Sequence, residues 1–229
     1  MNTKLNAKLQ KEGYDSFIYY ATEDIKDDFC DFHLAKLTPI FDRYVCNPKR
    51  ILEIGFGSGR LMTRVQALYP DAAISGTEVR PSLVELMQNK GYDCHVVDDE
   101  VIPGNVNYDL IYGTSVLHHF SAPYKFIRHA FSRLNSGGVL IFSCEPHLFN
   151  LPCIAYSTVR GIWHLEKHLL KLTRAKVEAT AKSLTDDYRF YYDDASYFPV
   201  FPIAYRLYKL FRLTHVSLFS EFHLVLVRD

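Results

Sequence analysis

The chain has 229 residues, which is enough for one large domain with a substantial core. Its 26 basic and 26 acidic residues balance, with a sequence pI of about 7.1. A chain without net charge is not typical of nucleic-acid-binding proteins, because phosphate contacts normally need a basic surface.

Cysteine usage and hydropathy favour a cytoplasmic protein. The five cysteines are odd in number and lack C-x-x-C spacing, so the sequence indicates neither a metal site nor a disulfide framework. The first twelve residues are polar and contain no apolar core of a secretory signal. No apolar run approaches the roughly 20 residues that cross a bilayer. Nothing in the sequence predicts the oligomeric state.

Residues 1–47 are expected to form a helical preface to the main domain. Apolar residues recur at helical spacing between residues 24 and 44. Thr38 and Pro39 resemble an N-cap followed by a proline in the first helical turn, which predicts two helices rather than one. Such a preface would pack over the ligand end of a sheet, or simply cover the core.

A glycine-rich turn follows the first strand pattern. Gly55, Gly57 and Gly59 lie between the apolar run 51–54 and a helical pattern at 61–68. Glycine is needed in such a turn because Cβ atoms would keep the backbone from approaching what it holds. The spacing G-x-G-x-G differs from the G-x-G-x-x-G of dinucleotide folds. It predicts a tight turn and a helix N-terminus that faces a ligand.

Strand and helix patterns alternate as far as residue 146. Strands are predicted at 51–54, 72–77, 95–97, 109–112 and 139–142, with helices at 61–68, 81–89 and 123–134. This alternation predicts a parallel, doubly wound sheet that binds ligands outside the carboxyl ends of its strands. Polar residues follow these strand ends: Glu53 to Gly59, Glu78, Asp98 and Asp99, Thr114 to His119, and Glu145.

The last third of the sequence is predicted to form a cap and a hairpin. Residues 151–182 have the pattern of a long helix with a basic stripe over 160–174, and 186–202 have the acidic, aromatic composition of an irregular lid. The stripe suits an anionic substrate, an acidic membrane surface or a merely solvated helix face. Residues 211–219 and 222–227 are expected to pair as an antiparallel hairpin.

The order of elements resembles that of the class I S-adenosylmethionine-dependent methyltransferases that act on small molecules. The acid-x-Gly-x-Gly-x-Gly phrase from Glu53 to Gly59 carries the resemblance, as do Tyr108 to Phe120 and Leu134 to Leu140, where Ser136 replaces a proline. It implies one α/β domain over 1–229 with a mostly parallel seven-stranded sheet. Its parts would be the preface 1–47, a cofactor core 48–150, a substrate cap 151–210 between strands five and six, and the hairpin 211–229.

The resemblance also assigns residues to S-adenosylmethionine. The three glycines would wrap its methionine and ribose, and Glu53 would orient its amino group. The other cofactor-binding residues that it implies are Phe56, Glu78 for the ribose, Val79, Asp98 and Asp99 for adenine, and Thr114 and Ser115 beside the sulfonium. Each acid also has a simpler interpretation, as a solvated residue at the end of a strand.

A methyltransferase must align its acceptor and, for a hydroxyl acceptor, remove a proton. His118, His119 and Glu145 are the candidate bases, because they follow the fourth and fifth strands on the same rim. Histidine titrates near neutral pH, which suits this role. The histidine pair is equally interpretable as a turn that hydrogen-bonds the backbone. Glu145 is equally interpretable as a helix-start or salt-bridge acid.

The acceptor is predicted only by class. Gly113 to Ser115 replace the Asn/Asp-Pro-Pro-aromatic clamp of base-amine methyltransferases, and no Pro-Cys dipeptide occurs. A small-molecule acceptor is therefore expected, with no nucleic-acid partner. A hydroxyl is the expected acceptor group, and nitrogen and carbon acceptors stay open. Two alternatives stay open: a protein or RNA methyltransferase that uses 151–210 to bind its substrate, and a non-catalytic cofactor-binding scaffold.

Overall fold

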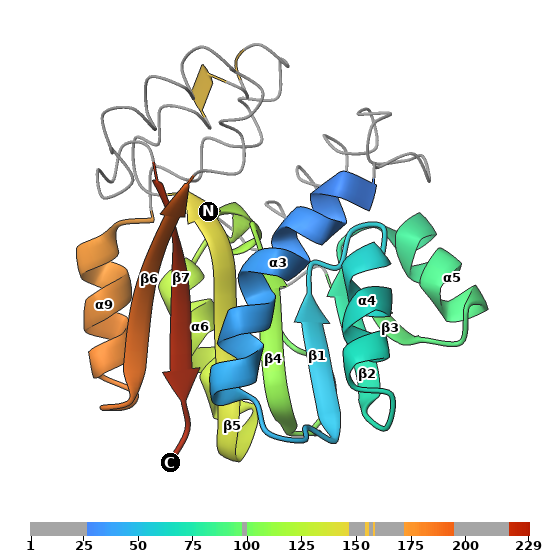
Figure 1. The fold of residues 1–229 in the computed structure, drawn as a ribbon, viewed down its shortest axis with the longest axis horizontal. Coiled ribbons are helices and arrows are strands. Elements are labelled where there is room, and N and C mark those ends of the chain that lie inside the picture. Colours follow the sequence, from blue (N-terminus) through green and yellow to red (C-terminus); the bar gives the residue numbers. More distant parts are fainter. Residues whose placement is uncertain (1–26, 98–99, 147–153, 156–157, 159–171, 195–219) are drawn as a thin grey trace.

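The computed structural model describes residues 27–97, 100–146, 154–155, 158, 172–194 and 220–229. These residues build one seven-stranded sheet with helices on both faces (Figure 1). The strand order is β3-β2-β1-β4-β5-β7-β6; the first five strands are parallel, and β7 runs antiparallel to both β5 and β6. The predicted fold class is thus confirmed. The strands are β1 Arg50–Ile54, β2 Ala73–Glu78, β3 Asp93–Val96, β4 Tyr108–Thr114, β5 Leu134–Pro146, β6 Tyr188–Asp194 and β7 Ser220–Val227.

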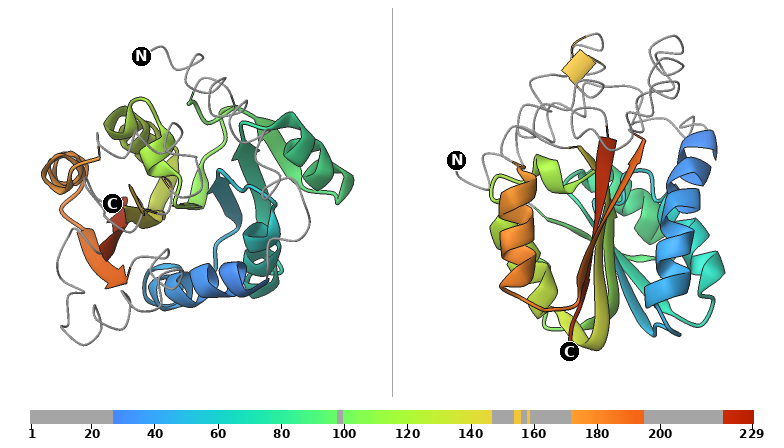
Figure 2. Two further views of the ribbon diagram at one scale, coloured as in Figure 1. Left: turned by 90° about the horizontal axis from the view of Figure 1, so that it is seen from above. Right: turned by 60° about the vertical axis from the view of Figure 1, so that its left-hand side comes forward.

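Helices lie on both faces of the sheet (Figure 2), and one apolar core fills the space on each side. The helices α3 Asp27–Tyr44, α4 Arg60–Leu68 and α5 Pro81–Asn89 cover one face. The helices α6 Pro123–Ser132 and α9 Arg174–Lys182 cover the other, together with the short 3₁₀ helix η1 Leu117–His119. Successive side chains of a strand point to opposite faces of the sheet, so each central strand contributes residues to both cores. The sheet is therefore buried on both sides, as parallel sheets usually are.

The prediction of two helices in the preface is wrong for the described part. A single helix, α3, continues through Pro39. The hydroxyl of Thr38 donates to the carbonyl of Leu34 at 2.8 Å, one turn earlier, so it does not cap a new helix. Leu37 and Phe41 on either side of the proline are buried in the core. This packing outweighs the roughly 3 kcal/mol that a proline costs inside a helix.

The sixth strand also differs from its prediction. β6 at Tyr188–Asp194 lies within the segment that was predicted to be an irregular lid and part of the 151–210 cap. It pairs antiparallel with β7, as residues 211–219 were expected to do. Tyr188 and Phe190 pack into the α6 side of the core, while Tyr191 packs into the α3 side. Aromatic residues on both faces suit a strand. The charges at 187, 189 and 193–194 obscured it, although charged residues are common on edge strands.

Other boundaries moved by a few residues. β5 begins at Leu134, before the strand predicted at 139–142, and its register to β4 shifts between Tyr108 and Leu110. The helix expected at 123–134 ends at Ser132. Within the predicted helix 151–182, the described helical residues are 154–155, 158 and those of α9. Most of the basic stripe lies outside the described residues. So do residues 1–26, Asp98, Asp99 and 211–219. Within the described ranges, no helix has the length and apolar character needed to cross a bilayer.

Candidate active site

The three glycines of the turn after β1 all adopt left-handed backbone angles. Their φ values are +66° at Gly55, +55° at Gly57 and +74° at Gly59, a region that residues with a Cβ rarely adopt. A Cβ at Gly55 would lie 2.5 Å from Cγ2 of Val116, and one at Gly59 would overlap the Met87 side chain. A Cβ at Gly57 would meet nothing within 4 Å. The outer two glycines therefore serve close packing, while Gly57 faces open space.

Glu78 at the end of β2 is tied to this turn by its carboxylate. Oε2 accepts a hydrogen bond from the backbone N–H of Gly57 at 3.0 Å. Oε1 accepts from the N–H groups of Val79 at 2.9 Å and Arg80 at 3.3 Å. Burial raises the pKa of Glu78, and the three backbone donors and Arg80 oppose that shift. The acid is thus fixed beside Gly57 in the rim position where the sequence placed the ribose ligand.

Glu53 lies below the turn, inside the sheet. Its side chain is buried, and the hydroxyl of Tyr112 on β4 donates to its Oε2 at 2.7 Å. Burial, helped by the negative charge of Glu78, raises the pKa of Glu53 to about 8, and the Tyr112 hydrogen bond opposes this shift. In the protein without cofactor, Glu53 is therefore largely a neutral acid at pH 7, buried beneath the glycine turn.

The raised pKa predicts a pH-dependent stability for Glu53→Gln. Between pH 4.5, the ordinary pKa, and pH 8, the unfolded chain loses the Glu53 proton while the folded protein keeps it, so wild-type stability falls as pH rises through this window. The amide does not titrate and still accepts from Tyr112. We expect the Tm difference between variant and wild type to increase by about 10 °C from pH 5 to pH 8. Thermal unfolding at both values measures it; an unchanged difference would contradict the buried neutral acid.

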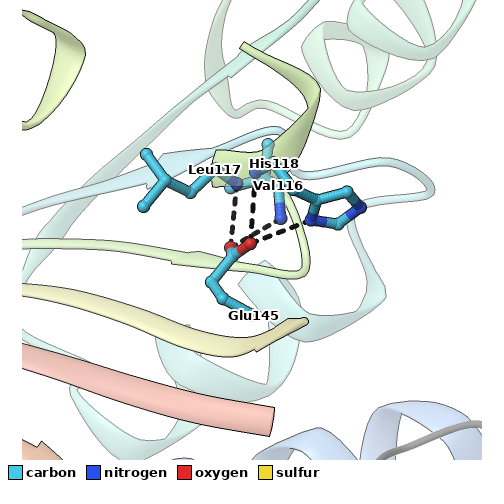
Figure 3. Close-up of polar contacts among 4 residues, drawn as sticks. All are labelled: Val116, Leu117, His118 and Glu145. Atoms are coloured by element: carbon cyan, nitrogen blue, oxygen red, sulfur yellow. Dashed lines mark hydrogen bonds and ion pairs between the residues drawn. The ribbon is translucent and has the colours of Figure 1, made fainter. Parts of the chain in front are cut away.

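The turn after β4 is held by Glu145 of β5 (Figure 3). Oε1 of this fully buried carboxylate accepts from the N–H groups of Val116 and Leu117, each at 2.8 Å. Oε2 accepts from the N–H of His118 at 3.2 Å and lies 2.9 Å from its Nδ1. Because both oxygens already accept from N–H groups, we assign the proton between Oε2 and the ring to Nδ1 of His118. With four such contacts, Glu145 fits a structural acid, as in the salt-bridge interpretation, better than a catalytic base.

The remaining predicted residues lie around this turn. Thr114 and Ser115 are half-buried at the end of β4, and Ser115 has a left-handed φ of +51°. The rings of His118 and His119 are 4.0 Å apart between centroids; His118 is buried, whereas His119 is half-buried. Phe56 points into the core against Gly76, so its backbone alone is available to a ligand.

The structure adds residues that sequence reasoning missed. Tyr112 is the partner of Glu53, and a tyrosine inside a strand gave no signal of this. Glu100, at a left-handed φ of +59°, accepts from both the N–H and the hydroxyl of Ser121 at 2.7 and 3.0 Å. His129 accepts from the N–H of Ile102 at 3.0 Å. These contacts tie the loop before β4 to α6, at the rim where adenine was expected.

The fold and the site together define the class. The Cβ position of Gly57 is open, the Glu78 carboxylate accepts from the Gly57 N–H, and α4 begins three residues later, an arrangement suited to a cofactor at the carboxyl ends of the strands. The seven-stranded order with an antiparallel β7 is the class I methyltransferase arrangement that the sequence resemblance implied. Among the described residues, no group of three or more His, Cys, Asp or Glu side chains gathers to hold a metal ion.

Comparison with known proteins agrees with this class. Residues 52–140 match a family model described as a methyltransferase domain. The malonyl-[acyl-carrier protein] O-methyltransferase of Anoxybacillus flavithermus is 27% identical over 121 residues, which cover 51% of this chain and 47% of the relative. The corresponding protein of Priestia megaterium is 26% identical over 146 residues, 61% of this chain and 52% of the relative. The chain spans about half the length of these curated relatives.

Among solved structures, the plantazolicin methyltransferase BpumL in complex with SAH and a pentazolic desmethylPZN analog has a TM-score of 0.66 at 13% identity. The similarity covers 99% of this chain and 97% of that one, which shows the shared fold. Residues 52–140 are therefore similar to a methyltransferase domain, and the chain shares the fold of a solved methyltransferase that binds SAH.

Proposed function

We propose that the protein transfers the methyl group of S-adenosylmethionine to an oxygen atom of a small-molecule acceptor, with a hydroxyl as the acceptor group. One observation carries the proposal: the His118–His119 turn lies directly against the glycine turn. The backbone of Gly55 is so close to Val116 that a Cβ there would clash with it at 2.5 Å. The side of the site from which an acceptor would approach is therefore next to two histidines.

The cofactor supplies, when bound, a methyl group activated by a positive sulfur. The chain then has three tasks. Gly57 leaves room for the cofactor, and Glu78 offers carboxylate oxygens beside it. Thr114 and Ser115 would lie beside the methyl group and would orient the acceptor. His119, the more accessible of the two histidines, would accept the proton of the acceptor hydroxyl.

His118 and Glu145 support His119 in this proposal. His118 is buried, and its Nδ1 is engaged by Glu145, so neither group is accessible to an acceptor. They fix the backbone that carries His119. Such support matters because an acceptor oxygen must lie about 3 Å from both the methyl carbon and the base.

A carboxylate acceptor is the second candidate. The curated relatives are named malonyl-[acyl-carrier protein] O-methyltransferases, which favours oxygen and adds an acid carried by a protein to the possible acceptors. An ionised carboxylate has no proton to lose, so it needs no base. The two candidates therefore differ in how strongly they depend on His119.

His119→Asn separates these acceptors. Asparagine keeps a polar side chain but cannot take up a proton at neutral pH. For a hydroxyl acceptor we expect kcat to fall by about 100-fold or more, with S-adenosylhomocysteine affinity unchanged. The acceptor is first found by incubating the protein with methyl-labelled cofactor and fractionated small molecules, carrier proteins and RNA, and the variant is then assayed on it.

His95→Asn is the matched control, because His95 is an exposed histidine at the end of β3 whose salt-bridge partner is the exposed Asp93. It is expected to keep wild-type kcat. An unchanged rate in His119→Asn with a hydroxyl acceptor would remove His119 as the base. Label in protein or RNA alone would overturn the small-molecule proposal, and label in no fraction would support a non-catalytic scaffold.

A further inference from the structure

Strand β5 contains one residue more than β7 in the stretch that leads to Glu145. Phe142 lies opposite Leu224, whereas Glu145 lies opposite Phe222, so two residues of β5 share one partner on β7. The extra residue is Cys144, whose φ of +56° is left-handed. One extra residue with an unusual backbone angle is a β-bulge, a feature that re-aims the side chains after it.

The bulge decides which face of the sheet Glu145 reaches. Val139 and Ile141 of β5 enter the core below α3, and Leu140 and Phe142 enter the core below α6. Regular alternation would continue this pattern and place Glu145 on the α3 face. The additional residue moves it to the α6 face, which is also the face of Leu117 in the turn after β4. Without the bulge, the carboxylate would point away from the backbone N–H groups that it holds.

Side chains from other elements surround the bulge. Sγ of Cys144 lies 3.2 Å from Nδ1 of His33 on α3, and Oγ of Ser143 lies 2.7 Å from Nδ1 of His223 on β7. All four residues are buried. Burial, with Lys36 and His223 nearby, lowers the pKa of His33 to about 3, so its ring is neutral and suited to a hydrogen bond with a thiol. A left-handed non-glycine residue costs roughly 1–2 kcal/mol, so it persists only where its surroundings hold it.

We infer that Cys144 is a positioning residue: its left-handed bulge, anchored to His33 of α3, aims Glu145 at residues 116–118 and so fixes the His118–His119 turn at the methyl-transfer site. The inference rests on the proposed function only where it assigns the turn to catalysis. The positioning of Glu145 by the bulge does not depend on it. Through the contact between His33 and Cys144, which are 111 positions apart, helix α3 supports the active site.

The test compares two substitutions of Cys144 in the full chain saturated with S-adenosylhomocysteine. Glycine adopts the left-handed angle freely, whereas valine, which is β-branched, does not. In Cys144→Gly we expect amide exchange at 116–118 within about threefold of wild type, and His118 keeps its proton on Nδ1 by ¹⁵N NMR. In Cys144→Val we expect exchange there to be at least about tenfold faster, with the fixed His118 tautomer lost.

Cys94→Val is the matched control, since Cys94 is equally buried, in β3, and is not among the residues with positive φ. It should leave residues 116–118 unchanged. If Cys144→Val does not fold, Cys144→Ala decides, because it keeps a Cβ at the strained angle and removes the thiol; we expect it to exchange faster than Cys144→Gly. Wild-type protection in the valine or alanine variant, or loss of protection in the glycine variant, would overturn the inference.

These readouts need no methyl acceptor, so they are independent of the proposed function. Once an acceptor is known, Cys144→Val should lower kcat by at least about tenfold and leave the KM for cofactor within about twofold, the pattern of a lost transition-state alignment. If the NMR results are as expected and no acceptor is ever methylated, the proposed function fails while the positioning of Glu145 by the bulge stands. An unchanged kcat would overturn the assignment of the bulge to catalysis.

Discussion

Glu145→Ala is expected to destabilise the protein more than any other single change described above, by about 3–5 kcal/mol. The substitution leaves the N–H groups of Val116, Leu117 and His118, and the His118 ring, without the carboxylate that accepts from them. Glu145 has no solvent-exposed surface, so water cannot replace it without opening the structure. Chemical denaturation gives the loss in free energy of unfolding, and amide exchange shows whether it begins at 116–118.

Glu178→Ala provides the comparison for this change. Glu178 is a partly exposed acid on α9 that pairs with Arg174 and Lys182 one turn away on either side. Surface pairs of this kind contribute little, so we expect a loss of no more than about 1 kcal/mol. If Glu145→Ala and Glu178→Ala were equally mild, the carboxylate of Glu145 would not be holding the turn, and its candidacy as a catalytic base would be restored.

Gly57→Ala is expected to have the largest effect on cofactor binding. Its Cβ would enter the open space above the turn, where S-adenosylmethionine is expected. We expect S-adenosylhomocysteine affinity to fall by about 100-fold or more, equivalent to about 3 kcal/mol. Calorimetric titration measures this loss directly.

Gly91→Ala separates this loss from backbone strain. Gly91 has a φ of +88°, and a Cβ there would also meet nothing within 4 Å, but it follows α5, and it is not part of the glycine turn. Both alanine variants should therefore lose a similar 1–2 kcal/mol of stability. Only Gly57→Ala should lose the cofactor. Equal cofactor affinity in the two variants would mean that the space over Gly57 is not the binding site.

The sheet was predictable from the sequence where each strand carries its own local signal. The apolar runs of β1 and β4 and the glycines that follow β1 specify buried parallel strands without any long-range information. β6 has no such signal: Arg189 interrupts its aromatic residues, two acids end it, and pairing with β7 makes it a strand. The prediction of two helices instead of α3 was wrong for a related reason. Buried residues on both sides of Pro39 keep the helix continuous, although a proline by itself favours a helix break.

The candidate site shows the same division. The glycine turn and Glu78 follow from spacing, and the structure brings them into contact. The role of Glu53 depends on its hydrogen bond with Tyr112, and that of Glu145 depends on the bulge at Cys144, which forms where β5 pairs with β7. Both features join residues that are distant in the sequence. Sequence alone presents both acids as rim residues, whereas the structure places both in the interior. Asp98 and Asp99, outside the described residues, stay predictions for the adenine site.

The most direct test of the account is a calorimetric titration of the wild-type chain with S-adenosylhomocysteine and, separately, with a nicotinamide dinucleotide. The geometry of the glycine turn and Glu78 predicts one S-adenosylhomocysteine per chain and no heat from the dinucleotide. Binding of the dinucleotide, with no binding of S-adenosylhomocysteine, would contradict the account at its centre.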